Sequence, residues 1–155
     1  MKYLIVGLAF LGLVACSQAP TDSPVLEEAF ATAFDALTVY SETEGMSEEG
    51  VQFINATVNY SEHACSILND PTLSTDERKL KLATDHDLTV FRADFVNSFG
   101  EVVASGELGP WGNFAVRRTM GIARRFVGDK GPEVWNGPCQ IVDTFAAQWA
   151  LTPQL

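Results

Sequence analysis

The chain has few of the residues on which most enzyme sites depend, with two histidines and three cysteines among 155 residues. None of the cysteines belongs to a CxxC or CxxH pair, so the spacing typical of zinc sites is absent. Ser-His-Asp spacing, a phosphate-cradling glycine loop and a haem motif are missing as well, and we predict no cofactor. Basic residues are also scarce: 10 Lys and Arg stand against 20 Asp and Glu. The formal net charge of −10 argues against a nucleic-acid partner and against a broad electrostatic grip on anionic lipid.

The sequence also lacks an apolar run of the length needed to span a bilayer, which is about 20 residues. Its most apolar stretch, residues 3–15, contains no charged residue and follows Lys2. One positive charge, a short apolar region and small residues before a cleavage point are typical of a secretory signal peptide. We therefore expect residues 1–15 to be a signal peptide.

The end of this stretch, LVAC at residues 13–16, resembles the lipobox of bacterial lipoproteins. The resemblance implies that Cys16 receives a diacylglyceryl group on its sulfur and that cleavage occurs just before it. Ser17 stands where an aspartate would resemble an inner-membrane retention signal, so the outer membrane is favoured, with the protein facing the periplasm. Residues 16–24 are then the lipidated cysteine and a flexible tether, because residues 17–24 have turn and disorder chemistry and reach at most about 29 Å.

Residues 25–155 predict a single all-α domain, a compact bundle of four or five helices. Apolar residues recur at spacings of three and four, and no strand-length alternation competes with them. Ser47 is expected to cap one helix, and Ser74 with Glu77 forms a capping-box pattern for the next, in which residues 85–87 permit a break. Two Gly-Pro segments, residues 106–112 and 131–138, are expected to be loops. The last two helices would then begin at Asn113 and Pro138.

Two cysteines, Cys65 and Cys139, remain after Cys16. In an oxidising envelope an even pair is more often bridged than free, so we predict a disulfide between them. A catalytic thiol is poorly supported, because His63 is two positions from Cys65 and that spacing separates side chains on a helix.

Arginine is concentrated in one predicted helix, as two adjacent pairs seven residues apart: Arg117, Arg118, Arg124 and Arg125. Guanidinium groups recognise planar carboxylates and phosphates. The four side chains are therefore candidates for binding phosphate, lipid A, a peptidoglycan carboxylate or an acidic partner. The alternative is that they form salt bridges with Asp and Glu of neighbouring helices or line a solvated face.

Two tryptophans, Trp111 and Trp135, fall in the predicted Gly-Pro loops. A loop tryptophan can stack on a sugar ring or enter a pocket of a partner. It can equally fold back as a lid over the core of the bundle.

The order His63, His86-Asp87 and Asp143 resembles the ligand order of HD-domain phosphohydrolases, which are all-helical and hold divalent metals. The resemblance implies an alternative function as a metal-dependent phosphohydrolase that uses these four residues. The apolar flanks of the central His-Asp pair are absent here, because residues 84–87 are all polar.

Together these features predict a non-enzymatic interaction or assembly module of a bacterial envelope. It would be held to the membrane by the lipid on Cys16 and presented to an envelope protein or to peptidoglycan.

The lipid anchor gives a first test. The variant Cys16→Ser is expected to lose all fatty-acid mass from its N-terminal peptide, because the acyl-accepting sulfur is gone. It should either keep its signal peptide or appear as soluble protein. Mass spectrometry of that peptide from wild-type cells decides the matter, and an unacylated wild-type N-terminus would refute the prediction.

Overall fold

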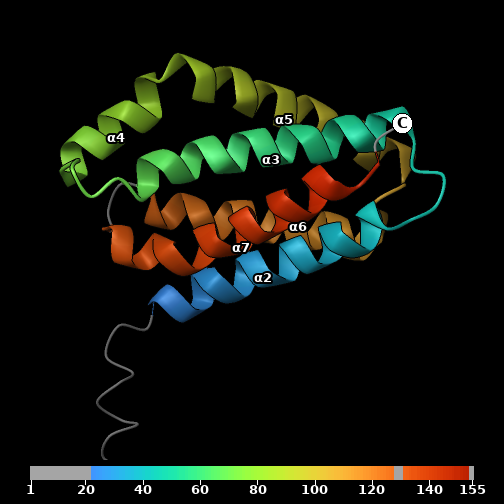
Figure 1. The fold of residues 1–155 in the computed structure, drawn as a ribbon, viewed down its shortest axis with the longest axis horizontal. Helices are drawn as coiled ribbons and strands as arrows, with labels where there is room; N and C mark the ends of the chain where they lie inside the picture. Colours follow the sequence, from blue (N-terminus) through green and yellow to red (C-terminus); the bar gives the residue numbers. More distant parts are fainter. Residues whose placement is uncertain (1–21, 128–130, 154–155) are drawn as a thin grey trace, which may run out of the picture.

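The computed structural model describes residues 22–127 and 131–153, and these fold into six α-helices with no strand (Figure 1). The helices are α2 (Asp22–Ser41), α3 (Glu48–Leu68), α4 (Thr75–Thr84), α5 (His86–Ser105), α6 (Gly109–Phe126) and α7 (Pro132–Leu151). The predicted all-α class is confirmed, but the described part of the chain has six helices, where four or five were expected. The expected signal peptide and Cys16 lie outside the described residues.

The extra helix arises at Asp85, which ends α4 and begins α5. Its backbone is extended, with φ −63° and ψ 122°. Its carboxylate accepts a hydrogen bond from the backbone N–H of Leu88 at 2.8 Å and lies 2.8 Å from Nε2 of His63. These two bonds, that from Leu88 first, hold the pKa of Asp85 below its usual range. The break that residues 85–87 permitted is therefore present, because one side chain caps α5 and ties it to α3.

Other helix ends agree with the sequence or correct it. The hydroxyl of Ser47 accepts from the N–H of Gly50, and Ser74 with Glu77 forms the expected capping box. Residues 22–24, which were assigned to the tether, belong to α2.

The two predicted Gly-Pro loops are wrong, because most of their residues belong to helices. α6 begins at Gly109, ahead of Asn113, and α7 begins at Pro132, so that Pro138 lies inside α7. The reason is that Pro110 and Pro132 occupy the first turns of these helices, where a backbone N–H has no intrahelical acceptor and its absence costs little. The same Gly-Pro pairs that mark loops therefore start helices here.

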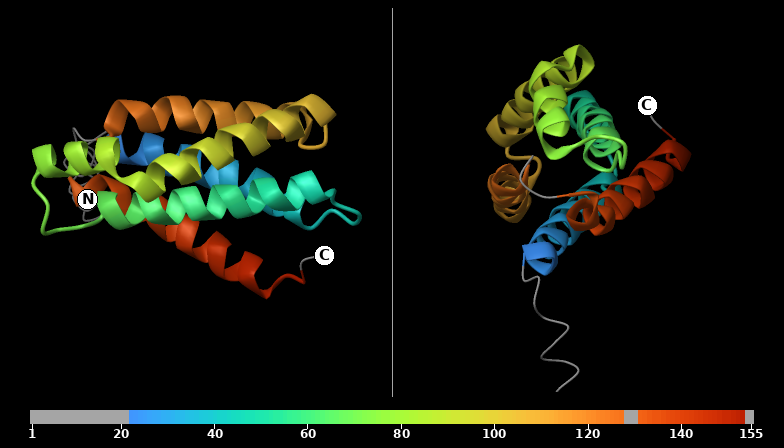
Figure 2. Two further views of the ribbon diagram at one scale, coloured as in Figure 1. Left: turned by 90° about the horizontal axis from the view of Figure 1, so that it is seen from above. Right: turned by 90° about the vertical axis from the view of Figure 1, so that its left-hand side faces the viewer.

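The helices form two groups of three (Figures 1 and 2). In one group α4 and α5 pack on α3, and in the other α6 and α7 pack on α2. The main contact between the groups is that of α3 with α7. At one end of it lies the disulfide Cys65–Cys139, and at the other the indole Nε1 of Trp149 donates to Oδ1 of Asn55 at 2.8 Å. We refer to this contact, with both links, as the α3–α7 seam.

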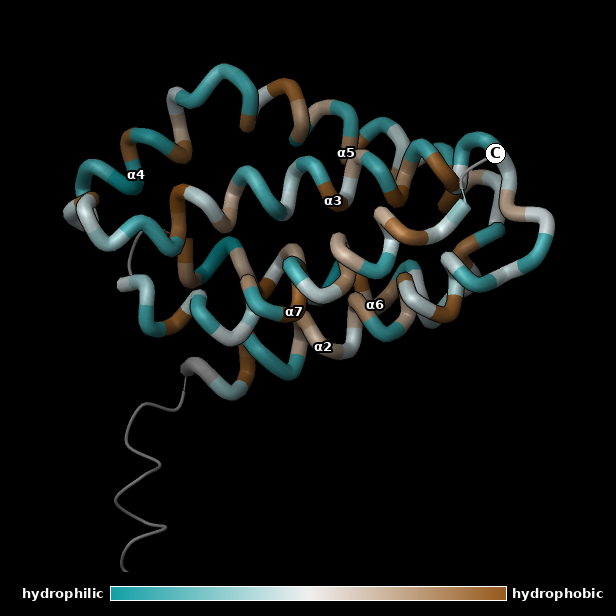
Figure 3. Tube along the Cα trace, in the orientation of Figure 1, coloured by the Kyte–Doolittle hydropathy of each residue, from teal (hydrophilic) through white to brown (hydrophobic). Residues whose placement is uncertain are grey.

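Aromatic side chains fill both groups. Phe53 of α3 packs on Phe95 and Phe99 of α5, and Phe34 of α2 packs edge-on against Phe145 of α7. Figure 3 shows hydrophobic positions recurring between hydrophilic ones along the helices. Within residues 22–127 and 131–153, no helix combines the length and the apolar character that a membrane span requires.

The predicted disulfide is confirmed. The Cα atoms of Cys65 and Cys139 lie 5.7 Å apart, and both residues are buried. The bond joins residues 74 positions apart, so it closes a long loop in the unfolded chain and fastens the two helix groups in the folded one.

Replacing both cysteines, Cys65→Ala with Cys139→Ala, should lower the free energy of unfolding by about 4 kcal/mol, the loop-closure value for this separation. Urea unfolding followed by circular dichroism measures the change. Reduced wild-type protein serves as the control and should unfold at nearly the same urea concentration as the double variant. An unchanged midpoint in both would contradict the assigned role of the bond.

Candidate functional site

Helix α6 combines a buried face of small residues with an exposed face of arginines. Gly112, Ala115 and Thr119 are buried, and among the described helices only α2 packs against α6 over an extended surface. The hydroxyl oxygen of Thr119 lies 2.8 Å from the carbonyl oxygen of Ala29 on α2 and 2.8 Å from that of Ala115. This close packing fixes the rotation of α6, so its long basic side chains all point away from α2.

The arginines do not share one face. Consecutive residues of an α-helix are about 100° apart around the axis. Arg118 and Arg125 share a side of α6 with Trp111 and Phe114, at spacings of three, four and seven residues. All four side chains are exposed, and the two aromatic ring centroids are 5.7 Å apart. We call these four residues the outer strip.

The other two arginines face α5. The guanidinium carbon of Arg117 lies 5.7 Å from the ring centroid of Phe99 on α5. Arg124, two turns further along α6, lines a cavity between α6 and α5. Arg117 and Arg124 therefore lie on one face of α6 and Arg118 and Arg125 on another, and the two faces have different surroundings.

The alternative explanation of the arginines was pairing with neighbouring carboxylates or a place on a solvated face. Among residues 22–127 and 131–153, none of the four arginines forms a salt bridge, and all four are exposed, as a solvated face requires. Arg124 and Arg125 stand in the last turn of α6, where positive charge is favourable at the negative end of the helix dipole. That effect does not extend to Arg117 and Arg118 in the middle of the helix.

The two tryptophans have opposite environments. Neither lies in a loop, since Trp111 belongs to α6 and Trp135 to α7, which corrects the expectation from sequence. Trp135 is 1% exposed and packs edge-on against Phe30. It therefore belongs to the core, in agreement with the alternative that it covers the core of the bundle. Its Nε1 has no hydrogen-bond acceptor among the described residues. Trp111 is 61% exposed and remains a candidate contact.

The four residues of the HD-like order do not come together. His63 on α3 pairs with Asp85, whereas His86 and Asp87 are exposed at the start of α5 and Asp143 is exposed on α7. Within the described ranges, no three His, Cys, Asp or Glu side chains are grouped as metal ligands. The geometry therefore gives the phosphohydrolase alternative no metal centre.

One basic residue of the region, Arg92 on α5, was not singled out from the sequence. It lines the same cavity as Arg124, and its guanidinium carbon lies 6.0 Å from the ring centroid of Tyr60. A signal was available, because Arg92 follows Leu88 by four positions and precedes Phe95 by three. An arginine thus occupies a position of the apolar stripe of α5.

Comparison of the chain with protein-family models, with curated proteins and with solved structures finds no significant match.

The two tryptophans give a matched test of these environments. Trp135→Ala should lower the free energy of unfolding by about 3–5 kcal/mol, because it leaves a large cavity beside Phe30. Trp111→Ala should change it by no more than about 0.5 kcal/mol. Chemical denaturation of both variants measures the difference, and equal losses would show that Trp111 is also part of the core.

Proposed function

We propose that this protein is a lipid-anchored module of a bacterial envelope which binds an acidic partner protein without catalysis. The lipid on Cys16 would hold it to the membrane, with the outer membrane favoured and the domain facing the periplasm. The outer strip of α6 would be the binding surface.

The observation that carries this proposal is the composition and exposure of the outer strip. Trp111 and Phe114 are 61% and 55% exposed and stand beside Arg118 and Arg125 on a helix with no acidic residue. Tryptophan and arginine are enriched among the residues that contribute most to protein–protein binding. The guanidinium groups of Arg118 and Arg125 suit the carboxylates of an acidic partner.

The placement of the strip favours a protein partner over the bilayer. With α2 beginning at Asp22, residues 17–21 reach at most about 18 Å from Cys16. The C-terminal end of α6, with Arg125, lies at the same end of the bundle as the start of α2 (Figure 2). Trp111 and Phe114 therefore stand at the end of α6 remote from the tether. The net charge of −10 also opposes flat contact with anionic headgroups.

Site-specific photo-crosslinking in cells tests the surface. A photoreactive residue in place of Phe114 should give a protein adduct whose crosslinked peptide is rich in Asp and Glu. Adding Arg118→Glu and Arg125→Glu should remove most of that adduct, because the charges then repel the partner. The thermal midpoint should change little, since both side chains are exposed and unpaired among the described residues.

Two controls sharpen the result. The same photoreactive residue at Ala83, which is exposed on α4, should not give this adduct. The exchange Lys81→Glu, also exposed on α4, changes the net charge but should leave the adduct at Phe114 intact. Crosslinks from Phe114 to lipid alone, to peptidoglycan alone, or to a protein that the Glu variants still capture would each contradict the proposal.

A further inference from the structure

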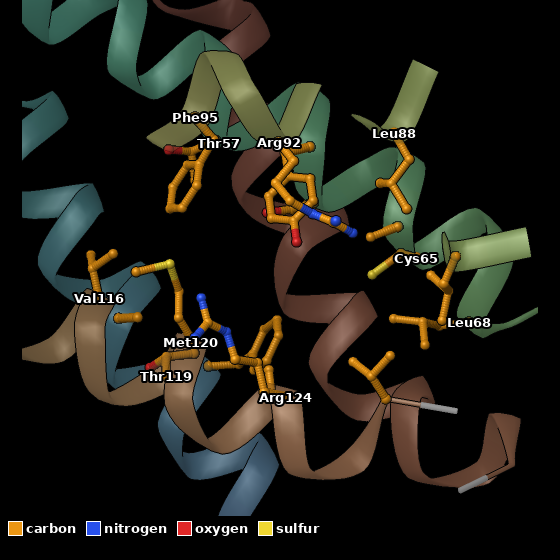
Figure 4. A pocket seen from close by; sticks show the side chains of 18 of the residues that line it. Thr57, Cys65, Leu68, Leu88, Arg92, Phe95, Val116, Thr119, Met120 and Arg124 are labelled. Atoms are coloured by element: carbon orange, nitrogen blue, oxygen red, sulfur yellow. The ribbon is translucent and has the colours of Figure 1, made fainter. Parts of the chain in front are cut away.

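A cavity of about 420 Å³ lies between α5 and α6 (Figure 4). Its inner wall comes from α2, α3 and Trp135 of α7, and it reaches inward as far as Cys65. Two of its apolar lining residues are exposed, Val96 on α5 and Val127 just after the end of α6. The cavity exists because α5 packs on α3 and α6 packs on α2, so these two outer helices do not close on each other.

The wall of the cavity is mainly hydrocarbon. It includes Leu37, Leu68, Leu82, Leu88, Val116 and Met120. The hydroxyls of Thr57 and Thr119 also line it, but they donate to the backbone oxygens of Phe53 and Ala29 at 2.8 Å. No Asp or Glu is among the lining residues, which is notable in so acidic a chain.

The charges at the cavity are both positive. Arg92 of α5 and Arg124 of α6 extend into the space from opposite sides (Figure 4). Both side chains are exposed, and neither forms a salt bridge with any residue of the described ranges. An apolar interior with two guanidinium groups at its opening is complementary to a molecule with a long apolar part and an anionic head.

We propose that this cavity binds a fatty acid, with its chain along the apolar wall and its carboxylate between Arg92 and Arg124. An apolar cavity of roughly 150 Å³ already holds benzene, so 420 Å³ leaves room for an alkyl chain. A carboxylate can accept from both guanidinium groups, which form their strongest hydrogen bonds with such planar anions. This site is separate from the outer strip, because Arg124 faces α5 and Arg125 does not.

The probe is palmitic acid with a diazirine on its chain, added to whichever cell fraction contains the full chain and then irradiated. After digestion, the labelled peptides should be those that contain the lining residues of the cavity, within residues 30–37, 57–68, 82–96 and 116–127. Unlabelled palmitate should compete, and shorter fatty acids should compete less, by about fourfold for each methylene lost from the cavity. The probe is added to the membrane or the soluble fraction, whichever contains the protein. The result therefore does not depend on whether Cys16 is lipidated.

Two variants test the binding of the carboxylate and the binding of the alkyl chain separately. Arg92→Gln with Arg124→Gln should reduce labelling about tenfold or more, whereas the charge-matched Lys79→Gln with Lys81→Gln on α4 should not reduce it. Ala123→Phe, which adds a ring to the cavity wall, should abolish labelling with both arginines in place. A circular-dichroism melt of each variant confirms that it is folded.

Competitors of equal chain length identify the head group. Palmitate should compete strongly and hexadecanol weakly, because the alcohol carries no charge. Stronger competition by a lysophospholipid than by palmitate would overturn the assignment of a carboxylate. Labelling mainly on peptides that contain no lining residue, such as residues 140–151 of α7, would overturn the site itself. Labelling unchanged in both the arginine and the Ala123→Phe variants would overturn it as well.

Discussion

The α3–α7 seam holds the two helix groups together, with the Cys65–Cys139 disulfide at one end and the Asn55–Trp149 hydrogen bond at the other. Because α5 packs on α3 and α6 packs on α2, no extended contact joins α5 to α6 directly. The seam therefore sets the distance between these two helices and, with it, the width of the cavity. Cys65 belongs both to the seam and to the wall of the cavity, so the covalent link lies beside the proposed ligand.

The packing of α6 on α2 is a second constraint. The small buried residues of α6 and the contact of Thr119 with Ala29 leave one rotation about its axis that packs well on α2. With that rotation fixed, the step of about 100° between neighbouring residues sends Arg124 toward α5 and Arg125 into the outer strip. Under the two proposals, one helix in an acidic chain would contribute to an anionic-ligand site and to the surface for an acidic partner.

Local chemistry explains which features the sequence predicts. The caps at Ser47 and Ser74 depend only on residues within one turn of the chain, and both are confirmed. The disulfide is confirmed as well, because Cys65 and Cys139 are the two cysteines that remain after the expected lipidation site. The Gly-Pro segments are ambiguous, because proline suits both a loop and a first helical turn. The burial of Trp135 and the cavity beside Arg92 arise from packing between helices that are far apart in the sequence. No local sequence pattern determines how such helices pack.

We propose that the arginines of this domain belong to two separate binding surfaces. The most direct measurement is an NMR titration of the arginine side-chain Nε–Hε signals with a soluble fatty acid. The signals of Arg92 and Arg124 should shift together and saturate, while those of Arg118, Arg125 and Arg78, which is buried, should stay in place. Shifts of equal size at all of these arginines, or shifts confined to Arg118 and Arg125, would show that the cavity is not a separate anion site.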